Sequence, residues 1–482
     1  MMTRTTGGES VAPTPTLNVR ARCLLPALRH GVEIALLLIA SCTSFHAATF
    51  RAAVAKADIS PPPGLPMYGF LDRIKDNKLS TGTLDPLYAR VLVMEVGERR
   101  VALVTLDLGR TFGEPVLAQL REQVKASAGV SFLIVTASHT HAGPNILDEY
   151  PANRPAEWEA TAAEKIVAAV SEASRHLVEA QIGTGRGEVY IGYNRRVVHP
   201  DHTVTMLWTN PVKQPTSPLD PTVLVMRVDD SSGTPLAVLV NYACHPVVLG
   251  ADNLKYSADY VGAMAKTVEA AFDGKPLCFF LQGADGDINP YYATTPLTQG
   301  ALERRDWSGK QLGEEAVRVA KAIHTRGSSN ATVDFADDVL SFQLRWGAAK
   351  FRQGLLNNYG PRVFKDHADL FAHDPPPSHL ELHLTTLLLD KQIAFVGMPG
   401  EPFVNFQINW RDRCPVQAAF FLGYTNGYFD YFPTIEAASE GGYGAGDSNT
   451  YVEAGAGERM LRQALVRVYE FLGKLSDAPE RN

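Results

Sequence analysis

Residues 101–108 (VALVTLDL) and 131–137 (SFLIVTA) are two short apolar runs that decide the fold class. Residues 114–127 lie between them and have the apolar spacing of an amphipathic helix. Both short runs carry apolar residues on both alternations, which is typical of strands covered on their two faces. This part of the chain therefore predicts a strand, a helix and a second strand of a buried sheet.

The same alternation of short apolar runs and longer amphipathic stretches continues from Phe50 onward. We predict further strands at 89–95, 221–228, 235–243, 277–282, 380–388 and 392–398, and further helices at 155–178, 258–273, 301–325, 401–411 and 452–474. The pattern predicts an α/β fold, or a mixed α+β fold, with a central mixed sheet sandwiched by helices. We expect residues 49–475 to form a single catalytic domain and residues 476–482 a C-terminal tail.

The composition excludes several classes of function. The 482 residues include 45 basic and 52 acidic side chains, which gives a formal charge of −7. With 45% apolar and 20% charged residues, the chain is typical of globular proteins that bury a large core. The mild acidity, without a run of Lys and Arg, argues against a nucleic-acid partner and against binding to an anionic membrane through charge.

The first 48 residues have the features of an export leader. A basic stretch precedes the apolar run 34–40 (IALLLIA), which is shorter than the ~20 residues of a membrane-spanning helix. Residues 39–42 (IASC) resemble a bacterial lipobox, which would make Cys42 the lipidated residue; cleavage near 47–48 is the alternative. We expect an exported protein that is periplasmic, extracellular or lipid-anchored, with peripheral membrane association if Cys42 is lipidated.

The cysteines beyond the leader do not form a paired framework. Three cysteines lie there, Cys244, Cys278 and Cys414, and an odd number cannot all be paired in disulfides. The sequence also contains no CxxC motif. We expect buried free thiols and no thiolate zinc site.

Three histidines directly follow predicted strands. His139 and His141 lie in SHTHAGP (138–144), and His245 lies in NYACHP (241–246). In open α/β sheets the ligand crevice lies past the carboxyl ends of the strands. Because alternate strand residues point to opposite faces, His139 and His141 can both reach a metal only if the backbone turns. The alternative interpretation is a pair of hydrogen-bonded loop histidines and a satisfied core histidine at 245.

A carboxylate and several phenols follow further along the chain. Glu401, in PGEP (399–402), is expected in a strand-to-helix turn, where the helix N-terminus favours an acid even without a functional role. The stretch 423–446 is rich in Gly and Tyr; its phenols can bind a metal when deprotonated, although tyrosines more often serve packing. Two imidazoles, a carboxylate and a phenol suit Zn²⁺, which lowers the pKa of bound water to about 7 and polarises a carbonyl.

Several motifs occur in the order found in a known family. They include Thr105-Leu106-Asp107, SHTHAGP, Asn194-Arg195, NYACHP, GADGDINP (283–290), PGEP and the tyrosine-rich stretch. Through this shared order the chain resembles the catalytic N-terminal domain of the neutral/alkaline non-lysosomal ceramidases. Members of that family are zinc amidohydrolases that cleave the N-acyl bond of ceramide.

The resemblance implies a role for each matching residue. The ligands of one zinc ion would be His139, His245, Glu401 and Tyr431, with Tyr428 as the alternative phenol. The remaining site residues would be His141 facing the substrate, Arg195 contacting it, and Tyr443 stabilising the developing oxyanion. Asn289 stands where the family has a serine implicated in catalysis. An asparagine cannot be a nucleophile, but its amide can orient a water or donate to an oxyanion.

The main hypothesis is therefore an exported zinc hydrolase of a linear amide, with N-acylsphingosine or a related N-acyl lipid as its small-molecule substrate and metal-activated water as the nucleophile. A zinc esterase, or an amidase directed at glycan or peptidoglycan, is the second hypothesis. The third is a non-catalytic surface protein that binds lipid or glycan and retains the ceramidase fold.

Overall fold

The computed structural model describes residues 49–76, 78–146, 156–347, 349–350, 353, 378–446 and 449–475. The chain divides into two units, 1–46 and 47–482, and the description below concerns the second. The expectations for the leader, for lipidation of Cys42 and for the tail at 476–482 lie outside the described residues. Within the described ranges, every helix is too short or too polar to cross a bilayer.

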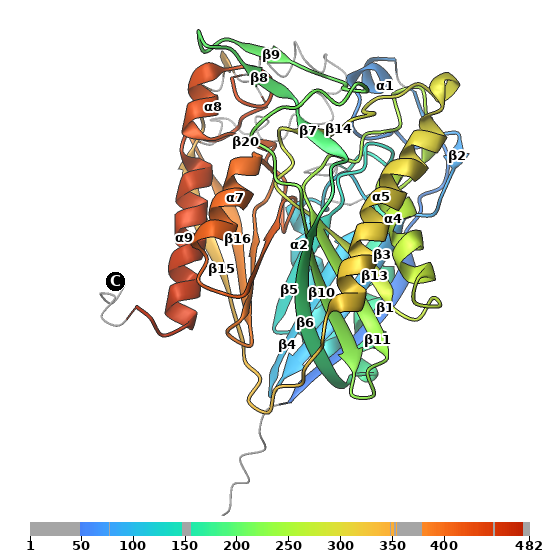
Figure 1. The fold of residues 1–482 in the computed structure, drawn as a ribbon, viewed down its shortest axis with the longest axis vertical. Helices are drawn as coiled ribbons and strands as arrows, with labels where there is room; N and C mark the ends of the chain where they lie inside the picture. Colours follow the sequence, from blue (N-terminus) through green and yellow to red (C-terminus); the bar gives the residue numbers. More distant parts are fainter. Residues whose placement is uncertain are drawn as a thin grey trace, which may run out of the picture. The chain divides into compact units, whose positions relative to one another are not determined.

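The larger of two main sheets has eight strands of mixed direction. Its spatial order is β13, β11, β10, β6, β1, β3, β4, β5 (Figure 1). The strands are β1 (Phe50–Asp58), β3 (Tyr88–Val96), β4 (Arg99–Leu106), β5 (Phe132–Ala137), β6 (Val178–Glu188), β10 (Thr222–Asp230), β11 (Pro235–Tyr242) and β13 (Leu277–Gln282). The pairs β4–β5 and β11–β13 are parallel, and the other neighbours are antiparallel.

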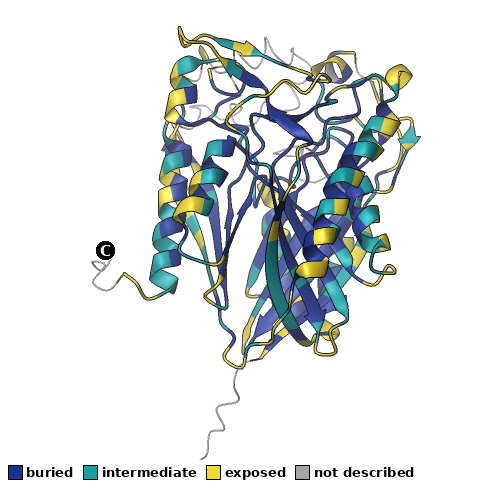
Figure 2. Cartoon of the chain, viewed as in Figure 1, coloured by how far each residue is buried: buried dark blue, intermediate teal, exposed yellow. Residues whose placement is uncertain are grey.

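A second sheet of four strands lies against one face of the first. It consists of β15 (Val333–Gln343), β16 (His379–Leu389), β17 (Ile393–Gly397) and β19 (Ala418–Leu422), with β17 and β19 parallel. One apolar cluster joins the two sheets, with Leu92 and Leu239 from the larger and Phe395 and Phe420 from the smaller. The rings of Phe395 and Phe420 stack with centroids 4.7 Å apart. The two sheets therefore share one apolar core, which Figure 2 shows as buried strands at the centre of the domain.

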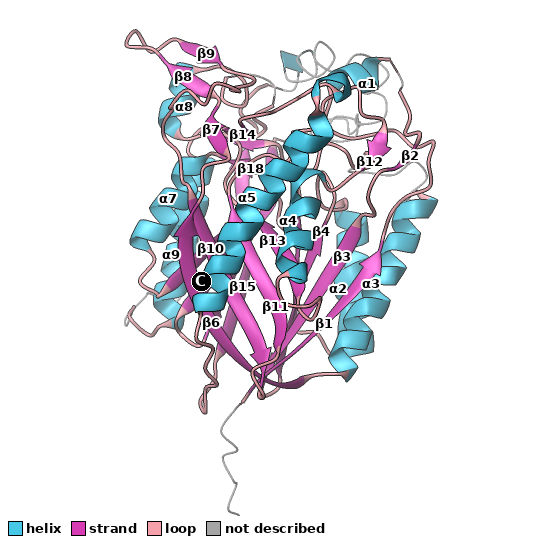
Figure 3. Cartoon of the chain, turned by 45° about the vertical axis from the view of Figure 1, so that its right-hand side comes forward, coloured by secondary structure: helices cyan, strands magenta, loops and turns pink. Residues whose placement is uncertain are grey.

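Helices cover the two outer faces of this pair of sheets. Packed on the larger sheet are α2 (Glu114–Ala128), α3 (Glu157–Arg175), α4 (Asp259–Ala270) and α5 (Ala301–Ala322), and on the smaller sheet α7 (Val404–Arg413) and α9 (Ala456–Phe471). Figure 3 shows α4 and α5 in front of the larger sheet and α3 at its right-hand side. The predicted mixed α/β fold with a large central sheet and flanking helices is confirmed. The described cysteines Cys244, Cys278 and Cys414 are buried and free, as expected.

The predicted strands are all present, but the helix expected at 401–411 begins later, at Val404. Glu401 and Pro402 instead form the short strand β18 (Glu401–Pro402), which pairs with β20 (Tyr431–Phe432). A residue that precedes proline is sterically disfavoured in the helical conformation, and Glu401 precedes Pro402. Glu401 therefore lies in the connection between β17 and α7, close to the helix N-terminus as expected, but in a short strand, and the expected start of the helix at 401 was wrong.

Strand β6 was missed because alternate positions along it are glycines. A Cβ on Gly183 would lie 2.6 Å from Ile323, and a Cβ on Gly185 would lie 2.9 Å from Val319 of α5. Side chains at these positions would separate α5 from the sheet. The glycines therefore allow close packing, and they remove the apolar alternation by which a strand is recognised.

The core between the sheets predicts a large stability effect at Phe395. We expect Phe395→Ala to lower the free energy of unfolding by about 3–5 kcal/mol, because it leaves a cavity beside Phe420. Val339→Ala on β15 is the control, since Val339 is 52% exposed; a change within ~0.5 kcal/mol is expected there. Urea unfolding of both variants measures the difference, and equal destabilisation would contradict a shared core between the sheets.

Candidate active site

The carboxyl ends of strands from both sheets meet at one end of the domain. The amide of Gly423, after β19, donates to the carbonyl of Gln282 at the end of β13, and Asn426 donates to Val135 of β5. Figure 1 places the short strands β7 (Gly192–Asn194), β14 (Ile288–Pro290) and β20 at this same end. Residues that follow the strands of either sheet can therefore share one site.

The three predicted histidines come together at this end. His139 has a φ of 68°, in the left-handed region, so the backbone turns between the two histidines of SHTHAGP. Their Nε2 atoms lie 3.2 Å apart, and one ring nitrogen from each of His139, His141 and His245 lies within 4.8 Å of the others. The structure thus contains the turn that would let both His139 and His141 reach one metal.

Hydrogen bonds to main-chain carbonyls orient two of these imidazoles. Nδ1 of His139 lies 2.7 Å from the carbonyl oxygen of Gly109, and Nδ1 of His245 lies 3.0 Å from that of Ile288. Because a carbonyl can only accept, each Nδ1 carries a proton, and in the neutral ring Nε2 is then the nitrogen with the free lone pair. The Oε2 atom of Glu401 lies 3.6 Å from His139 Nε2 and 3.3 Å from His245 Nε2.

These donors suit a divalent metal. Nε2 of His245 and Oε2 of Glu401 are buried and have no hydrogen-bond partner among the described residues. Buried polar atoms are seldom left unpaired, and a cation between them would satisfy both. Burial lowers the pKa of His139 to about 3, so its imidazole is neutral at physiological pH. Neutral imidazoles and a carboxylate are ligands that Zn²⁺ accepts.

Two tyrosines lie beside Glu401. Tyr431 is opposite Glu401 in the β18–β20 pair, and its phenol accepts a hydrogen bond from Arg195 at 3.1 Å. The Tyr428 hydroxyl donates to Glu401 Oε1 at 2.5 Å. Tyr443 lies next to Tyr431, with ring centroids 5.4 Å apart. The structure therefore brings Tyr443 and both candidate phenol ligands to the carboxylate, and the choice between Tyr431 and Tyr428 stays open.

Arg195 and Asn289 are in direct contact at the same place. The Arg195 guanidinium donates to Asn289 Oδ1 at 3.2 Å and to the carbonyl of Gly286 at 2.6 Å. Burial works against its charge, but nearby Tyr431 and Tyr443 raise the pKa of Arg195 above its ordinary value. A permanent buried cation therefore lies at the edge of the candidate metal site.

Sequence reasoning missed several residues that hold the site together. Asp285 accepts a hydrogen bond from Tyr424 at 2.6 Å, and its other oxygen lies 3.3 Å from Nδ1 of His245. Burial raises the pKa of Asp285 to about 7. Arg73 is buried and donates to the carbonyls of His141, Tyr68, Gly250, Ala251 and Asn253. Asp285 lies in a motif already noted, GADGDINP, whereas Arg73 gave no signal in the sequence.

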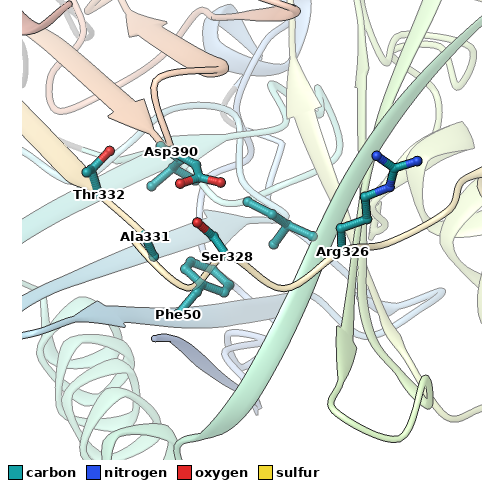
Figure 4. A pocket seen from close by; sticks show the side chains of 8 residues that line it. Phe50, Arg326, Ser328, Ala331, Thr332 and Asp390 are labelled. Carbon is teal, nitrogen blue, oxygen red and sulfur yellow. The ribbon is translucent and has the colours of Figure 1, made fainter. Parts of the chain in front are cut away.

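A separate hollow lies at the opposite end of the sheets. Phe50, Ser328 and Asp390 are among the residues that line it (Figure 4). Phe50 begins β1 and Asp390 follows β16, so the hollow is distant from the ends of β5 and β11 where His139 and His245 lie. Its lining contains none of the predicted site residues.

Comparison with known proteins identifies the family to which the chain belongs. Residues 50–302, more than half of the chain, match the family model described as neutral/alkaline non-lysosomal ceramidase, N-terminal. No curated protein sequence matches the chain.

Two solved structures share the fold. The neutral ceramidase from Pseudomonas aeruginosa superposes with a TM-score of 0.68 at 17% identity, over 90% of this chain and 76% of that one. A structure described as ceramidase complexed with C2 gives 0.69 at 18% identity, over 90% and 77%. At these identities the likeness shows the fold alone, whereas the match over residues 50–302 shows the family. The chain belongs to the neutral/alkaline non-lysosomal ceramidase family.

Proposed function

We propose that this protein is an exported, zinc-dependent hydrolase of the linear amide bond in N-acylsphingosine or a related N-acyl lipid. Family membership supports a ceramidase-like hydrolase. The observation that carries the metal is the buried, unpartnered pair of His245 Nε2 and Glu401 Oε2 beside His139. Export rests on the features of the first 48 residues.

The residues that would hold the zinc are already fixed by the fold. His139, His245, Glu401 and Tyr431 would be its ligands, with Tyr428 in place of Tyr431 as the alternative. When bound, zinc would polarise the amide carbonyl and acidify a water. The carbonyls of Gly109 and Ile288 favour the tautomer with the proton on Nδ1, so each neutral imidazole would offer Nε2 to the metal without a change of tautomer.

The remaining residues would act on the substrate. The phenol of Tyr443 would donate a hydrogen bond to the developing oxyanion. Burial lowers the pKa of His141, so its imidazole is neutral at physiological pH and its ring N–H can donate a hydrogen bond to the oxyanion. Arg195, held by the carbonyl of Gly286, would orient a polar group of the substrate.

Removal of a proposed ligand should abolish both metal binding and turnover. We expect His245→Ala and Glu401→Gln to lose bound zinc and hydrolysis of N-acylsphingosine, because each removes one of the converging donors. Elemental analysis and an amide-hydrolysis assay measure the two effects. His176→Ala is the matched control, since the His176 side chain is 66% exposed. Zinc-free protein with full activity, or a fully active His245→Ala variant, would refute the zinc proposal.

Loss of the Tyr443 hydroxyl should slow the chemical step and leave the metal in place. We expect Tyr443→Phe to lower kcat by about 10²-fold or more, the cost of removing one oxyanion donor, with zinc content unchanged. Tyr190→Phe serves as the control because Tyr190 is 55% exposed. If kcat is unchanged in Tyr443→Phe, Tyr443 does not stabilise the oxyanion.

Asn289 stands where the family resemblance leads us to expect a serine. This difference motivates a test of the second candidate function, a zinc esterase or an amidase directed at glycan or peptidoglycan. We expect wild-type protein to cleave N-acyl lipids faster than the matching O-acyl esters and peptidoglycan amides. Steady-state kcat/KM across such a panel decides between them. Exclusive ester or glycan turnover would favour the second function, and binding without turnover would indicate a non-catalytic protein.

A further inference from the structure

A series of aromatic side chains extends from the proposed metal ligands to the protein surface. Tyr431 is buried, Tyr443 is partly buried, and Trp208 is 49% exposed. The Tyr443 ring contacts Tyr431 on one side and Trp208 on the other, with centroid distances of 5.4 and 5.3 Å. Trp208 is thus the outermost member of a continuous series of contacts that begins next to Glu401.

The main chain at Trp208 is held in place by hydrogen bonds, and the residue is about half exposed. The main-chain carbonyl of Trp208 accepts a hydrogen bond from Asn289 Nδ2 at 3.2 Å, and the indole ring centroid lies 5.8 Å from Cζ of Arg195. The preceding residue, Leu207, donates its amide to the carbonyl of Arg195 at 2.8 Å and accepts from the Tyr193 hydroxyl at 2.9 Å. The backbone that carries the indole is therefore anchored to the residues around Arg195.

Asn289 links this tryptophan to the buried arginine. It is 3% exposed, its Oδ1 accepts from Arg195, and its Nδ2 donates to the Trp208 carbonyl. Both polar ends of the amide are thus engaged by the protein. An amide in this position is better suited to fixing Arg195 and Trp208 relative to each other than to orienting a water.

A half-exposed indole next to a buried guanidinium is suited to a ligand that has both an apolar and a polar part. Large aromatic surfaces left exposed next to a site commonly serve recognition. The apolar ring would contact a hydrocarbon chain. The adjacent guanidinium would contact a polar group that lies one or two bonds from the beginning of that chain. An N-acyl lipid carries such a chain beside its amide.

We propose that Trp208 is a specificity-determining residue that contacts the hydrocarbon chain adjoining the scissile amide, and that Asn289 is the positioning residue that holds it there. This inference rests on the proposed function and identifies the part of the substrate that Trp208 contacts. The contact is selective for chain length, because a truncated chain does not extend to the exposed indole.

Chain-length dependence tests this role. Trp208→Ala should lower kcat/KM for a long-chain amide by at least about tenfold, the cost of losing contact with roughly two methylene groups. The effect should fall to within about twofold when the chain on one side of the amide is shortened to two carbons. Trp208→Phe should restore most of the loss. Asn289→Ala should also lower kcat/KM for the long-chain amide, with zinc content unchanged. An equal loss on long and short amides, or no loss, would overturn the proposal.

A binding measurement separates this inference from the proposed function. The intrinsic tryptophan fluorescence of the full chain is titrated with laurate below its micelle concentration and, as a comparison, with acetate. We expect laurate alone to change the emission, and Trp208→Phe to abolish that change while Trp307→Phe retains it. If no amide is hydrolysed but this pattern holds, the proposed reaction fails and the chain contact stands. Wild-type emission that does not respond to laurate, or a response that persists in Trp208→Phe, would overturn the contact.

Discussion

The apolar contact between the two sheets is the interaction on which the candidate site depends. His139 and His245 follow strands of the larger sheet, whereas Glu401 and Tyr431 belong to the segments that follow the smaller one. Neither sheet alone supplies the full set of donors. The stacked rings of Phe395 and Phe420 and their apolar neighbours therefore position the chemistry as well as stabilise the fold. Parallel pairing of β11 with β13 and of β17 with β19 directs the following loops toward the same end.

Main-chain carbonyls orient several side chains of the candidate site. Gly109 and Ile288 fix the imidazoles of His139 and His245, and Gly286 holds Arg195. A main-chain carbonyl is present whatever the side chain at its position. The orientation of these side chains therefore depends on the course of the backbone more than on the identity of the neighbouring residues.

The sequence predicted those parts of the structure that have a local signature. Apolar runs located the strands, and the position of His139 and His245 after two of them anticipated their convergence. Strand β6 was missed because glycines that allow α5 to pack closely replace its apolar alternation, and the start of α7 was placed too early because Pro402 disfavours a helical conformation at Glu401. Arg73 could not be predicted at all. Its partners are carbonyls distant in sequence, and any residue type supplies a carbonyl.

The separation of the proposed zinc ligands along the chain has a consequence for biosynthesis. Glu401 follows His139 by 262 residues and Tyr431 follows it by 292, so the histidine emerges from the ribosome well before the carboxylate and the phenol. A nascent chain that ends before residue 401 holds the histidines but lacks the carboxylate that would complete their coordination. Metal loading would therefore wait until residues 401–431 have been made, and the compartment in which the chain folds would decide which ion it acquires.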